Sequence, residues 1–472
     1  MISPAESKVL DINAEALGIA TESLMESAGK GLADYVIDNF EPSKILIVCG
    51  TGNNGGDGSV AARYLKEKGW DVTLALVKSR EDIKSQLFLR NLEKLPEGVP
   101  VVENAGPDAI TGFPLILDGM LGTGLKDPPR EPYGGLVNAI NRSEAKVVSI
   151  DVPSGLGTEL AVKPHATVTF HDSKDGMTPE NSGEIKVVDI GIPKEAGDYV
   201  GPGEFVFYPV PDEKSHKGQN GRLLIVGGGP YTGAPALSAM AALRTGADLV
   251  WLAVPDGCYQ IIASYSPNFI VKPLPGDCLA PEHLQLIHGL LEEVDAVLIG
   301  PGLGRDERTV KAVRQLLSEI GKPAVLDADG LFALSEGQRT ILNGPAVLTP
   351  HKKEFERLAG NNETDVAKLA NMLGATLVLK GPEDIISDGQ HMKKNSTGNA
   401  AMSVGGTGDV LAGIIGALLA KGVEPYNAGR IGAYLSGRAG DHAFEELGYS
   451  LTATDVIANI PEALRLSLGH LK

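Results

Sequence analysis

The chain has 472 residues, of which 43% are hydrophobic and 22% charged, a composition typical of a globular enzyme with two or three domains. A formal net charge of −18 argues against nucleic acid and anionic membranes as partners. Any nucleotide would therefore need local backbone N–H groups, helix N-termini and cations. Neither a secretory signal peptide nor a membrane-spanning apolar stretch is visible, and the three cysteines lack disulfide or metal-ligand spacing. We expect a cytoplasmic enzyme.

The first part of the chain alternates short apolar runs with amphipathic segments. A glycine-rich turn follows the first run, and a helix is expected from about residue 59 to 68. Strands are expected at 44–50, 71–77, 114–118, 146–151, 166–170 and 185–190. This alternation predicts a parallel, doubly wound, Rossmann-like sheet.

A second set of elements follows a proline-containing stretch at 201–217, which we interpret as a linker between domains 1–209 and 210–472. Helices are expected at 234–245 and 408–420. Further strands are expected at 222–227, 249–254, 296–299, 324–327, 346–348 and 376–380. The fold class is thus α/β, with two doubly wound domains.

The sharpest motif in the second half is a Gly-Gly-Thr-Gly-Asp turn that opens a helix. Gly405, Gly406, Thr407 and Gly408 would direct backbone N–H groups at one point, and the helix N-terminus favours an anion there. A transferring phosphoryl group would suit this position. Asp409 could then take the proton of an attacking hydroxyl. The alternative is that these residues only cap a helix.

Ordered motifs around this turn resemble the ribokinase-like superfamily, specifically its NAD(P)H-hydrate dehydratases, over about Val210 to Lys472. The resemblance rests on the following segments: Lys217–Gly229, Tyr231–Ala234, Gly300–Gly304, Asp327–Gly330, Thr349–Phe355 and Lys380–Asp384. It implies a ribokinase-like domain that dehydrates the S form of hydrated NADH or NADPH with ADP or ATP. The hydroxyl would be phosphorylated and phosphate then eliminated.

The resemblance also implies roles for individual residues. The hydrate would contact Ala234, Gly302, Gly304, His351 and Asp409. The nucleotide would contact Lys380, Gly381, Pro382, Glu383, Asp384, Gly405, Gly406, Thr407 and Gly408. The family often has another residue at position 382, so Pro382 departs from its pattern. Asp327 and Asp329 would orient loops or hold Mg²⁺ through water.

In the first half, polar side chains follow three predicted strands. Asn54 lies in the turn after the first strand, Asp118 ends a second, and Asp151 and Ser154 follow a third. Carboxyl ends of parallel strands meet at one edge of a sheet, so these oxygens would converge. Such oxygens suit a hard cation, although Asn, Asp and Ser also commonly cap turns.

Three motifs here resemble the NAD(P)H-hydrate epimerase family, over about Met1 to Pro209. They are Asn-Asn-Gly-Gly-Asp-Gly, Asp-Gly-x-x-Gly-Thr-Gly and Asp-x-Pro-Ser-Gly. The resemblance implies K⁺ at Asn54, Asp118 and Ser154, with Asp151 as the candidate for proton transfer between R and S hydrates. The substrate would contact Asn53, Asn54, Gly55, Gly56, Asp57, Gly122, Thr123, Gly124, Leu125, Lys126, Asp127, Pro128 and Asp151.

Two alternatives remain open at this point. The second half could be a kinase for another small alcohol, since a glycine turn followed by Asp serves phosphoryl transfer generally. The first half could be a binding module without activity. The resemblance otherwise implies NADHX, NADPHX and ADP or ATP as ligands, with AMP as a product, and we expect a homo-oligomer.

Overall fold

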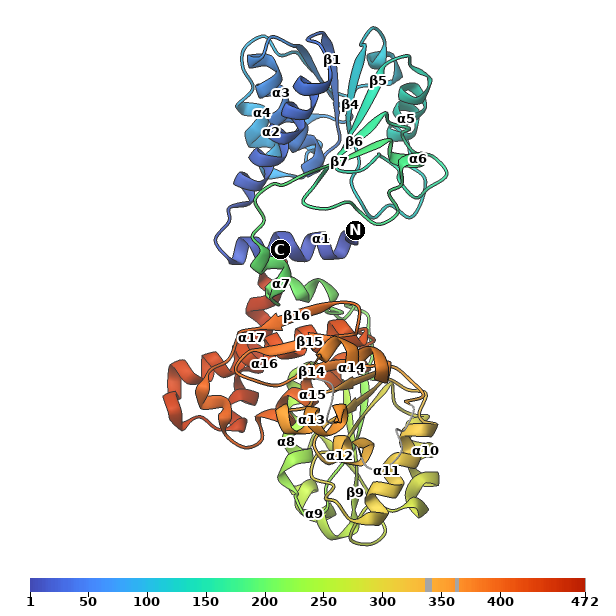
Figure 1. Ribbon diagram of the computed structural model, residues 1–472, viewed down its shortest axis with the longest axis vertical. Helices are drawn as coiled ribbons and strands as arrows, with labels where there is room; N and C mark the ends of the chain where they lie inside the picture. Colours follow the sequence, from blue (N-terminus) through green and yellow to red (C-terminus); the bar gives the residue numbers. More distant parts are fainter. Residues whose placement is uncertain (336–341, 361–364, 472) are drawn as a thin grey trace. The chain divides into compact units, whose positions relative to one another are not determined.

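The computed structural model describes residues 1–335, 342–360 and 365–471, which divide into two compact units, Met1–Lys194 and Glu195–Lys472. Each unit contains a sheet covered by helices on both faces (Figure 1). Across the described residues, none of the helices has both the length and the apolar character needed to cross a bilayer.

The first unit is built on a seven-stranded parallel sheet of order β3-β2-β1-β4-β5-β6-β7. Its strands are β1 (Lys44–Cys49), β2 (Asp71–Leu76), β3 (Val101–Val102), β4 (Leu115–Gly119), β5 (Lys146–Ile150), β6 (Ala166–Phe170) and β7 (Glu184–Val188). The doubly wound prediction is confirmed. Strand order reverses between β1 and β4, which is where ligands bind in open α/β sheets.

Helices cover both faces of this sheet, with α2, α3 and α4 together on one face and α5 on the other (Figure 1). Their bounds are α1 (Pro4–Ala16), α2 (Thr21–Asn39), α3 (Asn53–Glu67), α4 (Gln86–Glu93), α5 (Tyr133–Arg142) and α6 (Pro179–Ser182). Short 3₁₀ turns occur at η1 (Arg80–Asp82) and η2 (Pro107–Ile110).

Helix α3 begins six residues earlier than the sequence pattern predicts. The glycine-rich turn is its first turn, because its glycines allow close packing that outweighs their low helix propensity. An added Cβ at Gly55 would lie 2.7 Å from the Phe88 ring, and one at Gly58 would lie 2.9 Å from Ile47. These glycines therefore bring the start of α3 close to the sheet.

The second unit has a nine-stranded sheet among its described residues, of order β10-β9-β8-β11-β12-β13-β14-β15-β16. All neighbours are parallel except the last two pairs, β14–β15 and β15–β16. The strands are β8 (Arg222–Val226), β9 (Leu249–Pro255), β10 (Phe269–Leu274), β11 (Ala296–Ile299), β12 (Ala324–Leu326), β13 (Ala346–Leu348), β14 (Thr376–Leu379), β15 (Asp384–Ser387) and β16 (Met392–Asn395).

Two apolar clusters hold helices against the two faces of this sheet. One contains side chains of α8 (Gly233–Arg244), α9 (Asp256–Ser264), α15 (Thr407–Ala420), α16 (Pro425–Leu447) and α17 (Ala453–Gly469). The other contains side chains of α10 (Leu284–Leu291), α11 (Glu307–Glu319), α12 (Asp329–Ser335), α13 (Lys352–Ala359) and α14 (Val366–Leu373). The remaining short helices are α7 (Lys194–Asp198), η4 (Pro281–His283), η5 (Ala400–Ser403) and η6 (Gly448–Ser450).

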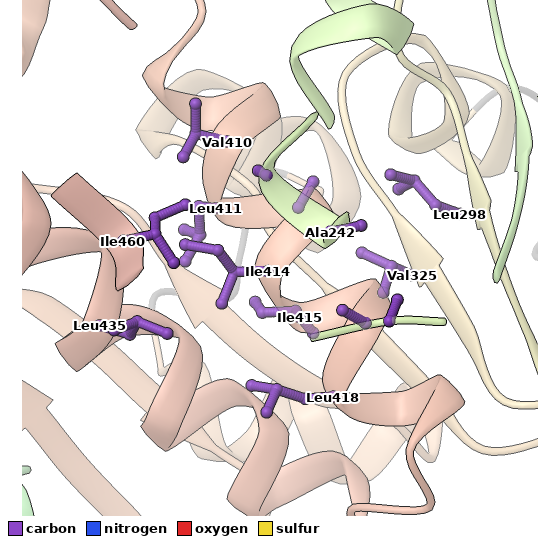
Figure 2. Close-up of a cluster of buried hydrophobic side chains, with 14 of the residues drawn as sticks. Ala242, Leu298, Val325, Val410, Leu411, Ile414, Ile415, Leu418, Leu435 and Ile460 are labelled. Atoms are coloured by element: carbon purple, nitrogen blue, oxygen red, sulfur yellow. The ribbon is translucent and has the colours of Figure 1, made fainter. Parts of the chain in front are cut away.

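Helix α15 occupies the centre of the first cluster. Figure 2 shows its side chains Ile414 and Ile415 between the sheet residue Val325 and the neighbouring helices that carry Leu435 and Ile460. Nearly every residue of α15 after its first turn is buried. Burial on all sides fixes the direction in which the exposed N-terminus of α15 points.

The boundary between the units falls between Lys194 and Glu195, earlier than the predicted boundary at 209 and 210. The predicted linker is wrong over its first part because η3 (Pro202–Phe207) packs into the second unit. Glu204 there is fully buried and contacts Arg430 and Lys393, with Lys393 Nζ 2.9 Å from its carboxylate.

Candidate active sites

The glycine turn of the second unit caps helix α15. Gly406 is the N-cap residue of this helix and has a left-handed φ of +99°. This backbone conformation is strained for residues that carry a side chain. The Thr407 hydroxyl donates to the Met402 carbonyl at 2.8 Å, which holds the turn closed. The N–H groups of the first turn thus face outward at the positive end of the helix dipole. The arrangement suits an anion.

Asp409 lies in this first turn, and its surroundings disfavour its charge. Burial and the nearby carboxylates Asp327 and Asp329 raise its pKa to about 7, although Lys380 acts in the opposite direction. Its backbone carbonyl accepts from Ser238 on α8 at 2.9 Å. A carboxyl group with this pKa can exchange a proton near neutral pH, as general base catalysis requires.

Lys380 connects the end of β14 to the start of α15. Its Nζ lies 2.9 Å from Asp327 Oδ1, which also accepts from the Thr349 hydroxyl at 2.8 Å. Burial would lower the pKa of Lys380, but the charge and hydrogen bond of Asp327 raise it overall. An added Cβ at Gly408 would lie 3.2 Å from this Nζ, so the ammonium adjoins the helix N-terminus. The two predicted parts of the nucleotide site therefore meet.

The nucleotide segment after Lys380 is held by hydrogen bonds between its own residues and β16. Asp384 accepts from Gly381 N at 3.0 Å and from Asn395 Nδ2 at 3.0 Å. Burial raises the pKa of Asp384, and these hydrogen bonds partly offset the rise. Glu383 pairs with Lys394 at 3.0 Å, while Pro382 is exposed.

The candidate hydrate residues of the second unit come from neighbouring strand ends. Gly302 and Gly304, after β11, both have left-handed φ values. An added Cβ at Gly302 would lie 2.4 Å from the Tyr231 carbonyl, so this loop packs against the segment before Ala234 on α8. The loop with Gly302 and Gly304 thus adjoins the segment Pro230–Pro235, within which Ala234 lies.

Asp329 holds the Gly304 loop in place. One of its carboxylate oxygens accepts from Gly304 N at 2.9 Å and the other from Arg305 Nε at 3.1 Å. Of the two roles considered for Asp329, loop orientation has direct support in these contacts. The described residues contain no group of three or more His, Cys, Asp or Glu able to hold a metal ion.

His351 has a clear structural role. It is the N-cap residue of α13, and its Nδ1 accepts from Lys353 N at 3.1 Å and Glu354 N at 3.3 Å. The residue is exposed, and its backbone pairs with Lys380 at the carboxyl end of the sheet. This cap fixes the ring at the start of α13, with Nε2 3.5 Å from Glu354.

In the first unit, Asp118 is fully buried at the end of β4 and receives only neutral hydrogen-bond donors among the described residues. Ser154 Oγ donates to Oδ1 at 2.5 Å, and Ser149 Oγ and Ser154 N donate to Oδ2, each at 2.9 Å. Burial raises the pKa of Asp118, and these hydrogen bonds partly offset the rise. An adjacent monovalent cation would compensate this buried carboxylate.

Asn54, at the start of α3, packs against the end of β4, where its backbone oxygen would lie 3.0 Å from an added Cβ at Gly119. Its amide nitrogen donates to the Ile150 carbonyl at 2.9 Å. Its Oδ1 and Nδ2 would lie 3.6 and 3.7 Å from an added Cβ at Gly122, so the side-chain amide adjoins the loop after β4. That loop forms a cavity of about 520 Å³ lined by Leu121, Gly122, Thr123, Gly124, Leu125, Lys126, Asp127, Pro128 and Arg130. All seven substrate residues predicted in the loop line this cavity.

Asp151 follows β5 in a left-handed conformation with φ +65°, which is uncommon for a residue with a side chain. Its carboxylate pairs at 2.6 Å with Lys174, whose side chain is 3% exposed. The sequence analysis did not single out Lys174. Its position in an Asp-Ser-Lys-Asp segment shortly after the strand 166–170 was the available signal.

Two further carboxyl groups interact electrostatically with Asp151. Asp57, buried in the first turns of α3, has a pKa well above its ordinary value because of burial and the charges of Asp151 and Asp11. Asp11 on α1 has a pKa of about 6, raised by surrounding protein atoms and by Asp151, although the residue is exposed at the surface. Sequence reasoning also missed Asp11.

Comparisons with known proteins cover both units. The family model of NAD(P)H-hydrate dehydratase matches residues 223–462, and that of the YjeF-related protein N-terminus matches residues 21–176. The bifunctional NAD(P)H-hydrate repair enzyme Nnr of Archaeoglobus fulgidus is 43% identical over 98% of each chain. The enzyme of the same name from Hyperthermus butylicus is 40% identical over 98% of this chain and 92% of its own.

Among solved structures, a ribokinase-like superfamily protein from Enterococcus faecalis V583 has a TM-score of 0.51 and 27% identity. The match covers 57% of this chain and 95% of that one. Fold and sites thus define a two-domain α/β enzyme with a ribokinase-like second unit. The chain belongs to the family of bifunctional NAD(P)H-hydrate repair enzymes.

Proposed function

We propose that this chain repairs hydrated NADH and NADPH through two activities. The first unit interconverts the R and S hydrates, and the second dehydrates the S hydrate with ADP or ATP. The similarity to repair enzymes along almost the whole chain supports this function. The observation that carries it is Asp409, with a pKa of about 7, beside the Lys380 ammonium at the N-terminus of α15.

In the second unit, the chemistry follows from the leaving groups. Hydroxide leaves carbon poorly, whereas phosphate leaves well. Asp409 takes the proton of the hydrate hydroxyl as that oxygen attacks the terminal phosphorus of the nucleotide. The bond from that phosphorus to the bridging oxygen breaks. Phosphate then leaves the ring carbon, and loss of the neighbouring ring proton restores the dihydropyridine.

The N–H groups at Gly405–Gly408 and the Lys380 ammonium stabilise the negative charge that develops on the transferring phosphoryl group. Asp327 holds Lys380 toward this position through the 2.9 Å ion pair. The Gly381–Asp384 segment binds the remainder of the nucleotide. Ala234, Gly302, Gly304 and His351 bind the hydrate.

Mg²⁺ would enter with the nucleotide. This ion is usually held by substrate phosphates together with one or two carboxylates, rather than by a cage of protein ligands. The described residues fit that pattern, because Asp327 and Asp329 act on Asp409 electrostatically without forming a cluster of ligands. The ion would neutralise phosphate charge.

In the first unit, Asn54, Asp118 and Ser154 would hold K⁺. The buried Asp118 carboxylate with neutral donors supports this assignment. The ion would fix the loop at Gly122–Pro128, which binds substrate together with Asn53–Asp57. Asp151 transfers the proton needed to interconvert the epimers.

The decisive experiment supplies mixed NADH-hydrate epimers with ADP or ATP and follows the absorbance of reduced nicotinamide. Both activities together give full recovery, whereas a dehydratase alone stalls at the share of one epimer. A stable phosphorylated product without dihydronicotinamide would instead indicate a kinase for another alcohol.

Replacing Asp409 by Asn should lower the rate of dehydration by about 10²- to 10⁴-fold, because the general base is lost. The two side chains have nearly the same shape, so the melting temperature should change little. Epimerisation measured without nucleotide is the internal control. A fully active Asp409→Asn variant would contradict the assigned role.

A further inference from the structure

Lys174 is a buried charged residue of the first unit to which no function has yet been assigned. Its ammonium has three protons and four acceptors within 3.1 Å: Asp151 Oδ1 at 2.6 Å, the Phe170 carbonyl at 2.8 Å, the Thr169 hydroxyl at 3.1 Å and the Asp172 carbonyl at 3.1 Å. All of its donors are thus engaged. A lysine fixed in this way cannot reach a substrate, but it can hold another group.

The group it holds is Asp151. The Asp151 N–H donates to the Val168 carbonyl at 2.7 Å. Its Oδ1 accepts from Lys174, from Thr169 and, at 3.3 Å, from Phe170 N. Among the described residues, Oδ2 accepts no hydrogen bond, and the side chain is 17% exposed. One oxygen is therefore fixed while the other remains available to a ligand.

Asp57 faces the same region, but its surroundings favour the neutral carboxyl group rather than the carboxylate. The hydrogen bond from Asn54 to the Ile150 carbonyl joins the start of α3 to the residue before Asp151. Asp57 lies three residues after Asn54, on the same face of the helix. It is 7% exposed, and its carboxyl group has no hydrogen-bond partner among the described residues. Burial and the charges of Asp151 and Asp11 disfavour its ionised form more than the Lys174 ammonium favours it.

We propose that Lys174 is a positioning residue that holds Asp151 as an ionised base opposite a neutral Asp57, which acts as the acid in epimerisation. This inference rests on the proposed epimerase activity. Two carboxyl groups in environments that favour opposite protonation states are a recurring basis for acid–base catalysis.

In the hydrate, the carbon that bears the hydroxyl is bonded to the ring nitrogen. Asp57 gives its proton to the hydroxyl oxygen, the C–O bond breaks with its electron pair on oxygen, and water leaves. The nitrogen lone pair forms a C=N⁺ bond and makes the carbon planar. Water then attacks the opposite face and gives a proton to Asp151 as the new C–O bond forms. Asp151 then releases its proton to solvent and Asp57 takes one up, so the pair is restored, with one water lost and one added.

The pH dependence of this step reflects every charged or titratable group that acts on the pair. Asp57 is influenced by Asp151, Asp11 and Lys174, and Cys49 on β1 is in turn influenced by Asp57. Asp172 pairs with the Met1 amine at 3.2 Å rather than with Lys174. The groups involved are Asp11, Cys49, Asp57, Asp151, Asp172, Lys174 and the N-terminal amine.

The test uses the full chain and measures interconversion of R and S hydrates by chromatography, without nucleotide, over a range of pH. In Lys174→Met the maximal rate should fall about 10²-fold at neutral pH while KM changes little. The acid-side limb of the rate profile should move to higher pH, because Asp151 no longer has a cation beside it. Lys174→Arg should restore part of the rate and return the limb toward its original pH.

Lys174→Met leaves Asp151 buried without its cation and could unfold the first unit, so Asp57→Asn provides an independent measurement. Asn has the volume and neutrality of the protonated acid, so this variant should keep its melting temperature and lose at least about 10²-fold in rate. A rate near that of the unaltered chain in Asp57→Asn would overturn the proposal. A folded Lys174→Met variant that loses activity equally at every pH would do the same.

Nucleotide-dependent dehydration of purified S hydrate serves as the control in all variants, since it occurs in the other unit. Absence of R–S interconversion in the unaltered chain would refute the proposed epimerase itself. Failure of Lys174 or Asp57 substitutions to act as described, in an otherwise active epimerase, would refute only the assignment of roles.

Discussion

Asp409 combines two conditions for a general base, because it lies in the first turn of a helix, where the dipole favours an anion, and its pKa is about 7. Both conditions depend on three-dimensional neighbours. Burial has the largest effect, and Asp327 comes from a different strand end. The sequence motif could predict the position of this carboxyl group at the helix start, but not its pKa.

The pH dependence of dehydration should follow from this pKa. A base must be deprotonated, so kcat/KM for S hydrate should be constant above about pH 7. Below this pH it should fall about tenfold per unit as Asp409 gains a proton. Initial rates between pH 5.5 and 9 at saturating nucleotide would reveal this limb. A profile flat down to pH 5.5 would contradict the role of Asp409.

Asp118 leads to a different prediction, because its buried charge lacks a protein cation among the described residues. If K⁺ binds there in the folded state only, each tenfold increase in K⁺ above its dissociation constant should add about 1.4 kcal/mol to the stability of the first unit. Thermal melts in KCl, with ionic strength held constant by a bulky organic cation, would measure this. Asp118→Asn should remove the dependence, whereas equal stabilisation of this variant would argue for a nonspecific salt effect.

At the scale of elements, most buried parallel strands could be predicted from short runs of apolar and β-branched residues, and 166–170, 296–299 and 346–348 match the structure at both ends. The antiparallel strands β15 and β16 were not predicted, because a segment such as Met392–Asn395 is short and polar. The start of α3 was misplaced because its glycines follow tertiary packing rather than helix propensity.

Some of the site residues could likewise be predicted from local sequence, whereas others depend on tertiary contacts. Asp151 and Asp118 stand at strand ends that the sequence pattern reveals. The effects of Lys174 and Asp11 on Asp151 and Asp57 depend on segments that meet only in the folded structure. Hypotheses based on motifs therefore proposed residues for both candidate sites but left out part of the charge network of the first one.

Close packing of α8 against α15 gives a prediction for Gly413. An added Cβ would lie 2.2 Å from the Ser238 carbonyl, so Gly413→Ala must push the two helices apart. We expect a loss of about 1–3 kcal/mol in the free energy of unfolding, together with slower dehydration, because Ser238 also contacts Asp409. Urea unfolding and initial rates measure the two effects.

Gly289 provides the matched control, since it is also a helical glycine but nothing lies within 4 Å of its added Cβ. Gly289→Ala should stabilise the chain by about 0.5–1 kcal/mol through helix propensity alone. Similar effects of the two substitutions would show that the close packing of α8 against α15 does not determine the loss of stability or of dehydration rate.

At the scale of the whole molecule, the observed boundary determines which fragments should fold. A fragment of residues 195–472 retains Glu204, whereas a fragment of 210–472 lacks the carboxylate that Arg430 and Lys393 contact. Disrupting a buried charge cluster in this way costs about 3–5 kcal/mol. The longer fragment should therefore unfold at a clearly higher urea concentration and dehydrate S hydrate faster at 37 °C.

Equal urea midpoints for the two fragments would show that η3 adds little to the stability of the second unit. The complementary fragment 1–194 tests whether the first unit is active without the second. If this fragment interconverts the hydrates, the first unit is not an inactive binding module. Assembly into a homo-oligomer stays a prediction, to be checked by sedimentation.

Each sheet places its candidate chemistry at the carboxyl ends of the strands. Turns at the amino ends of the strands therefore lie away from the candidate sites. The turn at Lys68 and Gly69 is one of them, between α3 and β2, with nothing within 4 Å of an added Cβ at Gly69. Strands such as β1 separate the two ends by about 20 Å. An epitope or a fluorescent reporter inserted at the turn of Lys68 and Gly69 should thus leave catalysis undisturbed.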